Sequence, residues 1–398
     1  MKEATPVTQD SVVGSKLTHV ATPVLGALGL AAHLGRGIQR VTTDAVLGDR
    51  RRFPRRIGDL DASVMSRIMG TTVESVSVLG GDAGTSARAR LALTGDGVPA
   101  SVFVKMPAET VAIRLIGELG RLGHTEVRFY DQLAPHITGV PACFGSDFDP
   151  LTGRFVLVLE DLAAGAPCEF PDTLHPLTAD GASSVVECLA RLHATFWDRL
   201  PARSEAGLLG WIYSPSEDDS SLLTSLMLAA SARRLSDQTD IPVDTGRYIN
   251  ENYRSVAQLI DNPPHTVMHG DAHPGNVYFR DGQAGLLDWQ AVRRGHPSRE
   301  LAYTLITSMT TEQRRVSERD LLDHYLDTLL SAGGPELDRA ELWDRYRQSA
   351  LYAYVAPLIT AGMGGMQNDA IAVEGLRRGV AALDDLDTVA LLQKSLGS

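Results

Sequence analysis

The sequence predicts an α+β protein in which a small antiparallel sheet lobe precedes a larger, mostly helical lobe. Short alternating apolar segments with a glycine-containing connection dominate residues 73–106, a pattern typical of antiparallel strands. Beyond residue 180, apolar residues instead recur at helical spacing over most of the chain. The chain has 398 residues, 43% of them hydrophobic and 22% charged, and this is enough to build two lobes.

The composition restricts the partners and the compartment that we expect. The net charge of −12 argues against a broad nucleic-acid surface, which needs clustered positive charge. No run of 18 apolar residues occurs, so we expect no integral membrane association. The three cysteines (Cys143, Cys168 and Cys188) contain no CxxC pair, which favours a reducing, cytoplasmic location. The oligomeric state is left open.

Residues 1–55 form an N-terminal extension with one predicted helix. Apolar residues of the segment 24–40 fall near one face of a helix, which favours packing against the main body. The stretch "RRRFPRR", residues 50–56, holds five arginines and is typical of a solvated linker or patch.

The first lobe is predicted to span residues 56–162. "DLDASVMSRIMG", residues 59–70, has the pattern of a capped helix. "VESVSVLGGDAGTSARARLAL", residues 73–93, predicts a strand, a glycine loop and a second strand. "SVFVKM", residues 101–106, predicts a third strand with Phe103 and Lys105 on one face. Helical patterning fills residues 109–134, and "RFVLVLEDL", residues 154–162, predicts a buried strand.

The second lobe is predicted to span residues 163–398 and to be mainly helical. Seven segments have helical patterning: 182–199, 218–236, 244–261, 300–309, 318–332, 338–362 and 370–394. They are interrupted by "TVMHGDAHPGNVYF", residues 266–279, which places two His, an Asp and an Asn between two apolar runs.

This polar stretch leads into a predicted hairpin. "NVYF" and "AGLLDW" flank the turn signal Asp281-Gly282, and a reversal centred near Gly282 places Asn276 opposite Asp288. An amide oxygen and a carboxylate at the open end of a hairpin suit Mg²⁺, which proteins hold together with substrate phosphates. Asp271 stands on the loop leading in, where its carboxylate can face the same site without binding the metal.

The stretch "HGDAHPGN", followed by "LLDWQ", resembles the signature HGDxHxxN plus Asp of the aminoglycoside phosphotransferase and choline kinase superfamily. Further segments resemble its ecdysteroid-kinase-like branch: "EVRFYDQL", "LVLEDL", "LARLHATFW" and "DWQAVRRGHPSRELAY". The resemblance covers roughly residues 55–365 and implies a two-lobed protein-kinase-like fold. It also implies ATP as phosphoryl donor and Mg²⁺ as cofactor.

The resemblance assigns roles to individual residues. Asp271 is expected to be the catalytic base, with His269 orienting the catalytic loop, and Asn276 and Asp288 are expected to hold Mg²⁺. In "RELAY", Glu300 replaces the aspartate that this family often carries, and we expect it to be structural.

The first lobe would form the nucleotide clamp. Backbone groups of "GGDAGTSARARL", residues 80–91, would approach the phosphates, although glycine loops also simply join strands. Lys105 would contact the phosphates and pair with Glu126, which shares a helix face with Tyr130 and Leu133. The alternative for Glu126 is a surface acid. The predicted nucleotide-binding set is Gly81, Gly84, Thr85, Ser86, Lys105, Glu126, Glu160 and Leu162.

The predicted reaction is transfer of the γ-phosphoryl group of ATP to a hydroxyl of a small molecule. The segment "ALYAYVAPLITAGMGGM", residues 350–366, is apolar and aromatic, and it could line a pocket for a lipophilic or steroid-like alcohol or form core. The alternatives are an aminoglycoside- or other antibiotic-type kinase and a non-catalytic nucleotide-binding protein of the same fold.

Overall fold

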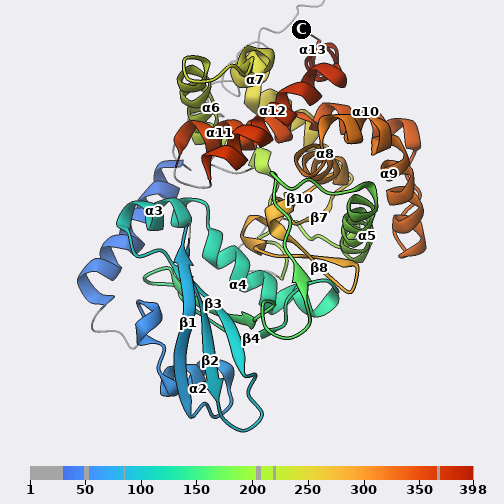
Figure 1. Ribbon diagram of the computed structural model, residues 1–398. Coiled ribbons are helices and arrows are strands. Elements are labelled where there is room, and N and C mark those ends of the chain that lie inside the picture. The colour runs from blue at the N-terminus through green and yellow to red at the C-terminus, as the bar shows by residue number, and fades with distance from the viewer. Residues whose placement is uncertain are drawn as a thin grey trace, which may run out of the picture.

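The computed structural model describes residues 30–48, 53–84, 86–202, 208–217, 221–364 and 368–397. The chain forms a small antiparallel sheet lobe and a larger helical lobe, as the sequence predicts (Figure 1). Within these ranges, no helix combines the length and the apolar character that crossing a membrane requires.

The sheet of the first lobe has five antiparallel strands in the order β1-β2-β3-β5-β4. Their bounds are β1 Ser75–Ala83, β2 Ser86–Thr94, β3 Ser101–Pro107, β4 Cys143–Asp149 and β5 Arg154–Glu160. Alternation along β5 sends Val156 and Val158 to one face of the sheet and Leu157 and Leu159 to the other. Helix α2 (Ala62–Met69) packs Met65 on the first face. Helix α4 (Leu122–Gln132) lies between the second face and the helical lobe (Figure 1).

Three expectations for this lobe need correction. Strand β4 was missed because its sequence, "CFGSDFD", contains glycine and aspartate, which are depleted in strands. The continuous helical pattern over 109–134 is two helices, α3 (Val111–Leu119) and α4, separated at Gly120 and Arg121, and Arg121 has a φ of 54°. The glycine loop is a tight hairpin, because β1 continues to Ala83 and β2 begins at Ser86.

The N-terminal extension contributes one helix, residues 30–47. The predicted helix ended at residue 40, and its first residues, 24–29, lie outside the described ranges. His33, Gly37, Val41 and Asp44 are buried on one face, and Gly37 packs beside Leu119 of α3. The extension therefore packs on the first lobe, as predicted, and its helix lies beside α3 (Figure 1). The predicted apolar face is wrong, because Ala31 and Ile38 of that face are exposed.

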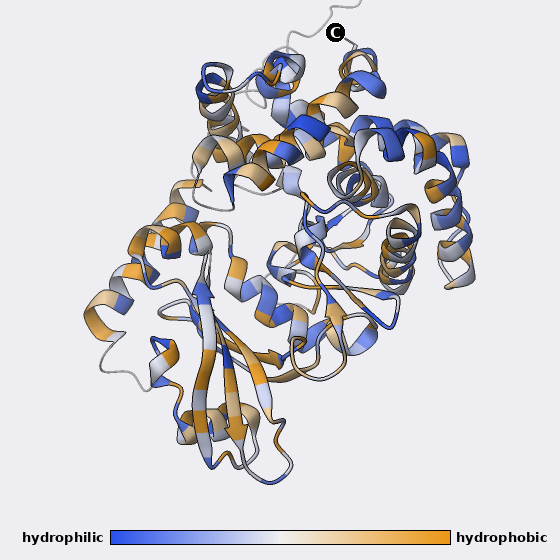
Figure 2. Cartoon of the chain, viewed as in Figure 1, coloured by the Kyte–Doolittle hydropathy of each residue, from blue (hydrophilic) through white to orange (hydrophobic). Residues whose placement is uncertain are grey.

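The helical lobe contains nine helices within the described residues: α5 Ala179–Phe196, α6 Ser221–Ser236, α7 Arg247–Ile260, α8 Pro297–Ser308, α9 Thr311–Ser331, α10 Arg339–Ser349, α11 Leu351–Met363, α12 Asp369–Asp385 and α13 Thr388–Leu396. Two predicted helices are divided in the structure. The segment 338–362 breaks at Ala350, and 370–394 breaks before Asp387, whose φ is 48°. Hydrophilic residues dominate α9 and α10 in Figure 2, on the outside of the lobe.

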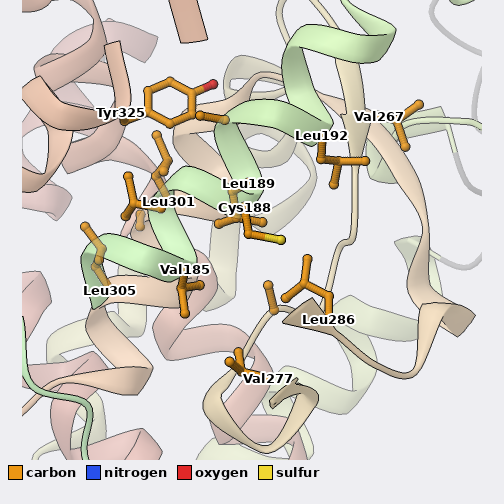
Figure 3. Close-up of a cluster of buried hydrophobic side chains, with 14 of the residues drawn as sticks. Val185, Cys188, Leu189, Leu192, Val267, Val277, Leu286, Leu301, Leu305 and Tyr325 are labelled. Atoms are coloured by element: carbon orange, nitrogen blue, oxygen red, sulfur yellow. The ribbon is translucent and has the colours of Figure 1, made fainter. Parts of the chain in front are cut away.

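Two small sheets lie inside this lobe: β6 (Cys168–Glu169) with β8 (Val277–Arg280) and β9 (Gln283–Leu286), and β7 (Thr266–Met268) with β10 (Arg293–Gly295). Figure 3 shows Cys188 and Leu189 of α5 in one cluster with Val277 and Leu286 of the β8–β9 hairpin. Leu301 of α8 belongs to the same cluster. The core of the helical lobe therefore holds the hairpin in place.

Candidate active site

The β8–β9 hairpin carries two of the predicted site residues. Its connection is the two-residue turn Asp281-Gly282, and both residues have positive φ (52° and 76°), as in a type I′ turn. Asn276 pairs with Leu287, whose amide donates to the Asn276 carbonyl at 2.8 Å. The predicted register, with Asn276 opposite Asp288, is wrong by one residue because the turn is centred between Asp281 and Gly282. Asp288 follows in a left-handed conformation (φ 60°) and still faces the same cleft as Asn276.

His269 begins the polar loop that follows β7. Its ring is fully buried, and Nε2 donates to the Leu287 carbonyl at 2.7 Å. Nδ1 accepts from the Asp271 amide at 3.2 Å, and the ring packs against Trp289 with centroids 4.5 Å apart. The side chain thus connects the loop to the end of the hairpin, which is the arrangement that an orienting residue needs.

Glu300 holds the same loop from α8. Its carboxylate accepts from the amides of His269 (3.1 Å) and Gly270 (2.7 Å), and from His193 Nε2 at 2.9 Å. Burial raises the pKa of Glu300, but the hydrogen bond and charge of His193 outweigh this effect and hold the pKa below its usual value. The Glu300 side chain therefore holds the backbone of the loop in place.

Asp271 lies at the edge of the site with a side chain 32% exposed. The Tyr303 hydroxyl donates to Oδ1 at 2.9 Å, and Asn276 Nδ2 donates to Oδ2 at 3.3 Å. Asn276 Nδ2 also donates to the Asp271 carbonyl at 2.9 Å. These bonds hold both the backbone and the carboxylate of Asp271.

Lys105 lies between two carboxylates. Its Nζ donates to Glu126 Oε2 at 2.6 Å and to Asp288 Oδ1 at 2.9 Å, across the two lobes. Burial lowers the pKa of Lys105, but the charges of Asp288 and Glu126 outweigh it and raise the pKa. Burial raises the pKa of Asp288, but Lys105 outweighs it and keeps the carboxylate ionised. Burial, together with the negative charge of Asp288, raises the pKa of Glu126 to about 7 against the opposing effect of Lys105. The predicted contact between Lys105 and Glu126 is therefore present.

Lys105, Glu126 and Asp288 form a triad, and a cleft of about 220 Å³ lies around it between the lobes. The predicted residues in its wall are Lys105, Glu126, Glu160, Leu162, Asn276 and Asp288. Phe103, Pro141, Leu159 and Phe170 supply apolar surface of the kind that accommodates a flat ring. Glu160 is also tied to the helical lobe, since its Oε1 accepts from Arg280 Nη2 at 2.6 Å.

The predicted glycine and serine residues of the segment 80–91 are not in the wall of this cleft. Gly81 lies within β1 opposite Ala89, and a Cβ at this position would approach the Arg88 carbonyl to 2.5 Å. Close packing of the hairpin thus explains this glycine without a ligand. Gly84 and Ser86 flank the connection and are not in the cleft wall, and Thr85 lies outside the described residues.

Two arginines of the cleft wall were missed in the sequence. Arg88 bonds to Asp82 at 2.9 Å, and Arg90 bonds to Asp161 at 2.9 Å. The signal was present in "SARARL": burial of the alternate residues Ala87, Ala89 and Leu91 directs both arginines to the opposite face of β2.

Comparison with known proteins identifies the family. Residues 81–347 match the model of the phosphotransferase enzyme family. The chain belongs to this family. No curated protein matches the chain in sequence.

Several solved structures are similar to this chain at low sequence identity. A Ralstonia eutropha protein whose assignment as an aminoglycoside phosphotransferase is provisional has a TM-score of 0.51 at 13% identity, covering 84% of this chain and 97% of its own. The choline kinase LicA of Streptococcus pneumoniae has a TM-score of 0.47 at 16% identity, covering 79% and 94% respectively. The macrolide 2′-phosphotransferase MphH of Brachybacterium faecium has 0.45 at 17%, covering 81% and 97%. At 13% identity, the similarity to the Ralstonia eutropha protein concerns the fold alone.

Proposed function

We propose that this phosphotransferase moves the γ-phosphoryl group of ATP to a hydroxyl of a small molecule, with Asp271 as the base. The observation that supports this most is the triad of Lys105, Glu126 and Asp288, in which two segments far apart in the sequence meet at one cleft. Asp271 adjoins the same cleft through its hydrogen bonds to Asn276.

The residues present fit Mg²⁺ held together with phosphates. No group of three or more His, Cys, Asp or Glu that could hold a metal occurs in the described part of the chain. Asp288 and Asn276 nevertheless offer one ionised carboxylate and one amide, and Asn276 directs its nitrogen to Asp271, which leaves its oxygen for a cation. One or two protein oxygens completed by substrate phosphates and water is a common Mg²⁺ arrangement. When bound there, Mg²⁺ would neutralise phosphate charge.

The residues of the chain would act mainly by positioning and electrostatics. Lys105 is raised in pKa and stays charged, so it can face the phosphates while Glu126 fixes its direction. The apolar wall of the cleft, which includes Phe103 and Leu162, would hold the adenine ring of ATP. Backbone groups of Glu160 and Leu162 would be the hydrogen-bond partners of the adenine. Asp271 would accept or orient the proton of the attacking hydroxyl.

The class of acceptor stays a prediction. Residues 351–363 of the apolar segment that suggested a lipophilic or steroid-like alcohol form α11, and residues 365 and 366 lie outside the described ranges. Leu351, Tyr354 and Leu358 are fully buried in a core cluster. The core reading therefore explains this segment, and a lipophilic acceptor now rests on the resemblance to the ecdysteroid-kinase-like branch alone. An aminoglycoside-type acceptor is the alternative. The three free cysteines favour a cytoplasmic location.

A non-catalytic nucleotide-binding protein is the second candidate. Loss of Asp271, Asn276, Asp288 or Lys105 would favour it, and all four are present. A panel of hydroxylated small molecules, including aminoglycosides and lipophilic alcohols, should be screened for Mg²⁺-dependent ADP release above the hydrolysis of ATP by water. Release with one acceptor class supports the enzyme. Stabilisation by ATP and Mg²⁺ without release from any acceptor supports the binding protein, and the absence of both overturns the proposal.

A further inference from the structure

Helix α8 reaches the catalytic loop at two points. It lies beside β7, the strand that leads into the loop (Figure 1). Glu300, in its first turn, holds the backbone of the loop through the amides of His269 and Gly270. Tyr303 follows three residues later, a spacing that places both side chains on one helix face. Its hydroxyl holds the side chain of Asp271.

The contact between Tyr303 and Asp271 has a defined direction. A carboxylate only accepts, so the phenol donates its proton to Oδ1 at 2.9 Å. Burial, and then the negative charge of Asp271, raise the pKa of Tyr303 well above its usual value, so the phenol stays protonated and remains a donor. Asn276 Nδ2 occupies the other oxygen at 3.3 Å. Two donors from different elements thus restrict rotation of the carboxylate.

We propose that Tyr303 is a positioning residue that holds the Asp271 carboxylate in the orientation that receives the proton of the acceptor hydroxyl. The proposal rests on the proposed function, because it assigns Tyr303 a role only if Asp271 is the base. Each carboxylate oxygen has two lone pairs, so one donor on each leaves capacity for the hydroxyl. Without Tyr303, a side chain that is 32% exposed can adopt other rotamers, and fewer encounters are productive.

The deciding experiment is a double-mutant cycle of Tyr303→Phe and Asp271→Asn. Tyr303→Phe removes only the hydroxyl, and we expect kcat to fall about tenfold or more, as for loss of a hydrogen bond to a charged group. The KM for ATP should change less than about twofold, because Tyr303 is not in the wall of the nucleotide cleft. In the Asp271→Asn background, Tyr303→Phe should have almost no further effect on kcat.

Tyr354→Phe is the matched control. Tyr354 is fully buried, whereas Tyr303 is half-buried, and it is likewise hydrogen-bonded, to the Val243 carbonyl and Asn250, but it lies in the separate core cluster of α11. Loss of the Tyr354 hydroxyl should lower the melting temperature of the protein without changing kcat. An unchanged kcat in Tyr303→Phe, or an equal fall in both Asp271 backgrounds, overturns the assignment of Tyr303 while the proposed function stands. A wild type without phosphoryl transfer to any acceptor overturns both.

Discussion

Asp44 connects the N-terminal helix to the first lobe through a buried charge cluster. Its side chain is 3% exposed and accepts from Arg114 of α3 and from Arg154 of β5, with Arg154 Nη2 at 2.7 Å. Both arginines are nearly buried as well. Asp44→Asn would leave these two buried guanidinium groups, and the more exposed one of Arg55 at 3.5 Å, facing an amide in place of a carboxylate.

The cost can be worked out from these contacts. Removing one partner of a buried ion pair typically destabilises a protein by about 3–5 kcal/mol. Arg114 keeps its bond to the Thr152 carbonyl and Arg154 keeps its bond to the Arg55 carbonyl, which favours the lower limit. At roughly 2–4 °C per kcal/mol for a large domain, the melting temperature should fall by about 6–12 °C.

Differential scanning fluorimetry at neutral pH measures this change, with Asp147→Asn as the control. Asp147 pairs with Arg67 at 2.7 Å in the same lobe, but the two side chains are 31% and 50% exposed. Such a pair contributes about 0–1 kcal/mol, so the control should melt within a few degrees of wild type. Equal shifts in the two variants, or no shift in Asp44→Asn, would refute the reasoning.

The dependence on pH provides an independent test of Asp44. Burial raises its pKa, but the bonds and charges of Arg154 and Arg114 outweigh burial and lower the pKa below its usual value. A group with a lowered pKa in the folded state stabilises it above the unfolded pKa, about 3.9, and loses this effect in more acidic solution. The difference in melting temperature between wild type and Asp44→Asn should therefore be constant from about pH 7 to 5 and narrow below about pH 4.

Three further predictions concern the active site. ATP with Mg²⁺ should raise the melting temperature of wild type but not of Asp288→Asn, because this variant loses the charged ligand; equal stabilisation of both would contradict the metal assignment. Asp271→Asn should keep the Kd for Mg·ATP while turnover falls by roughly 10²–10⁴, measured by calorimetry and ADP release, and wild-type turnover would exclude Asp271 as the base. Glu300→Gln should speed amide hydrogen exchange at His269 and Gly270, since a neutral side chain is a weaker acceptor for their amides; unchanged exchange there would show that Glu300 does not hold the loop.

Much of the fold and of the candidate site could be predicted from the sequence where residues act locally. The turn signal Asp281-Gly282 between two apolar runs indicated a hairpin, and Figure 3 shows that hairpin packed on α5. Helical periodicity placed Glu126 on the inward face of its helix, and it does contact Lys105. These predictions depend on turn chemistry and on the periods of helices and strands, which short stretches of sequence contain.

Contacts between distant segments were decided by the tertiary structure. The bond from Lys105 to Asp288 spans 183 residues, that from Tyr303 to Asp271 spans 32, and the link from Asp44 to Arg154 spans 110. The hairpin register depended on where the turn is centred, and the apolar α11 segment became core only because α6 and α12 pack on it. Local patterns state which face of an element is apolar, but not which element covers it. Which element covers a given apolar face depends on how all the elements together bury their apolar faces and satisfy their buried polar groups.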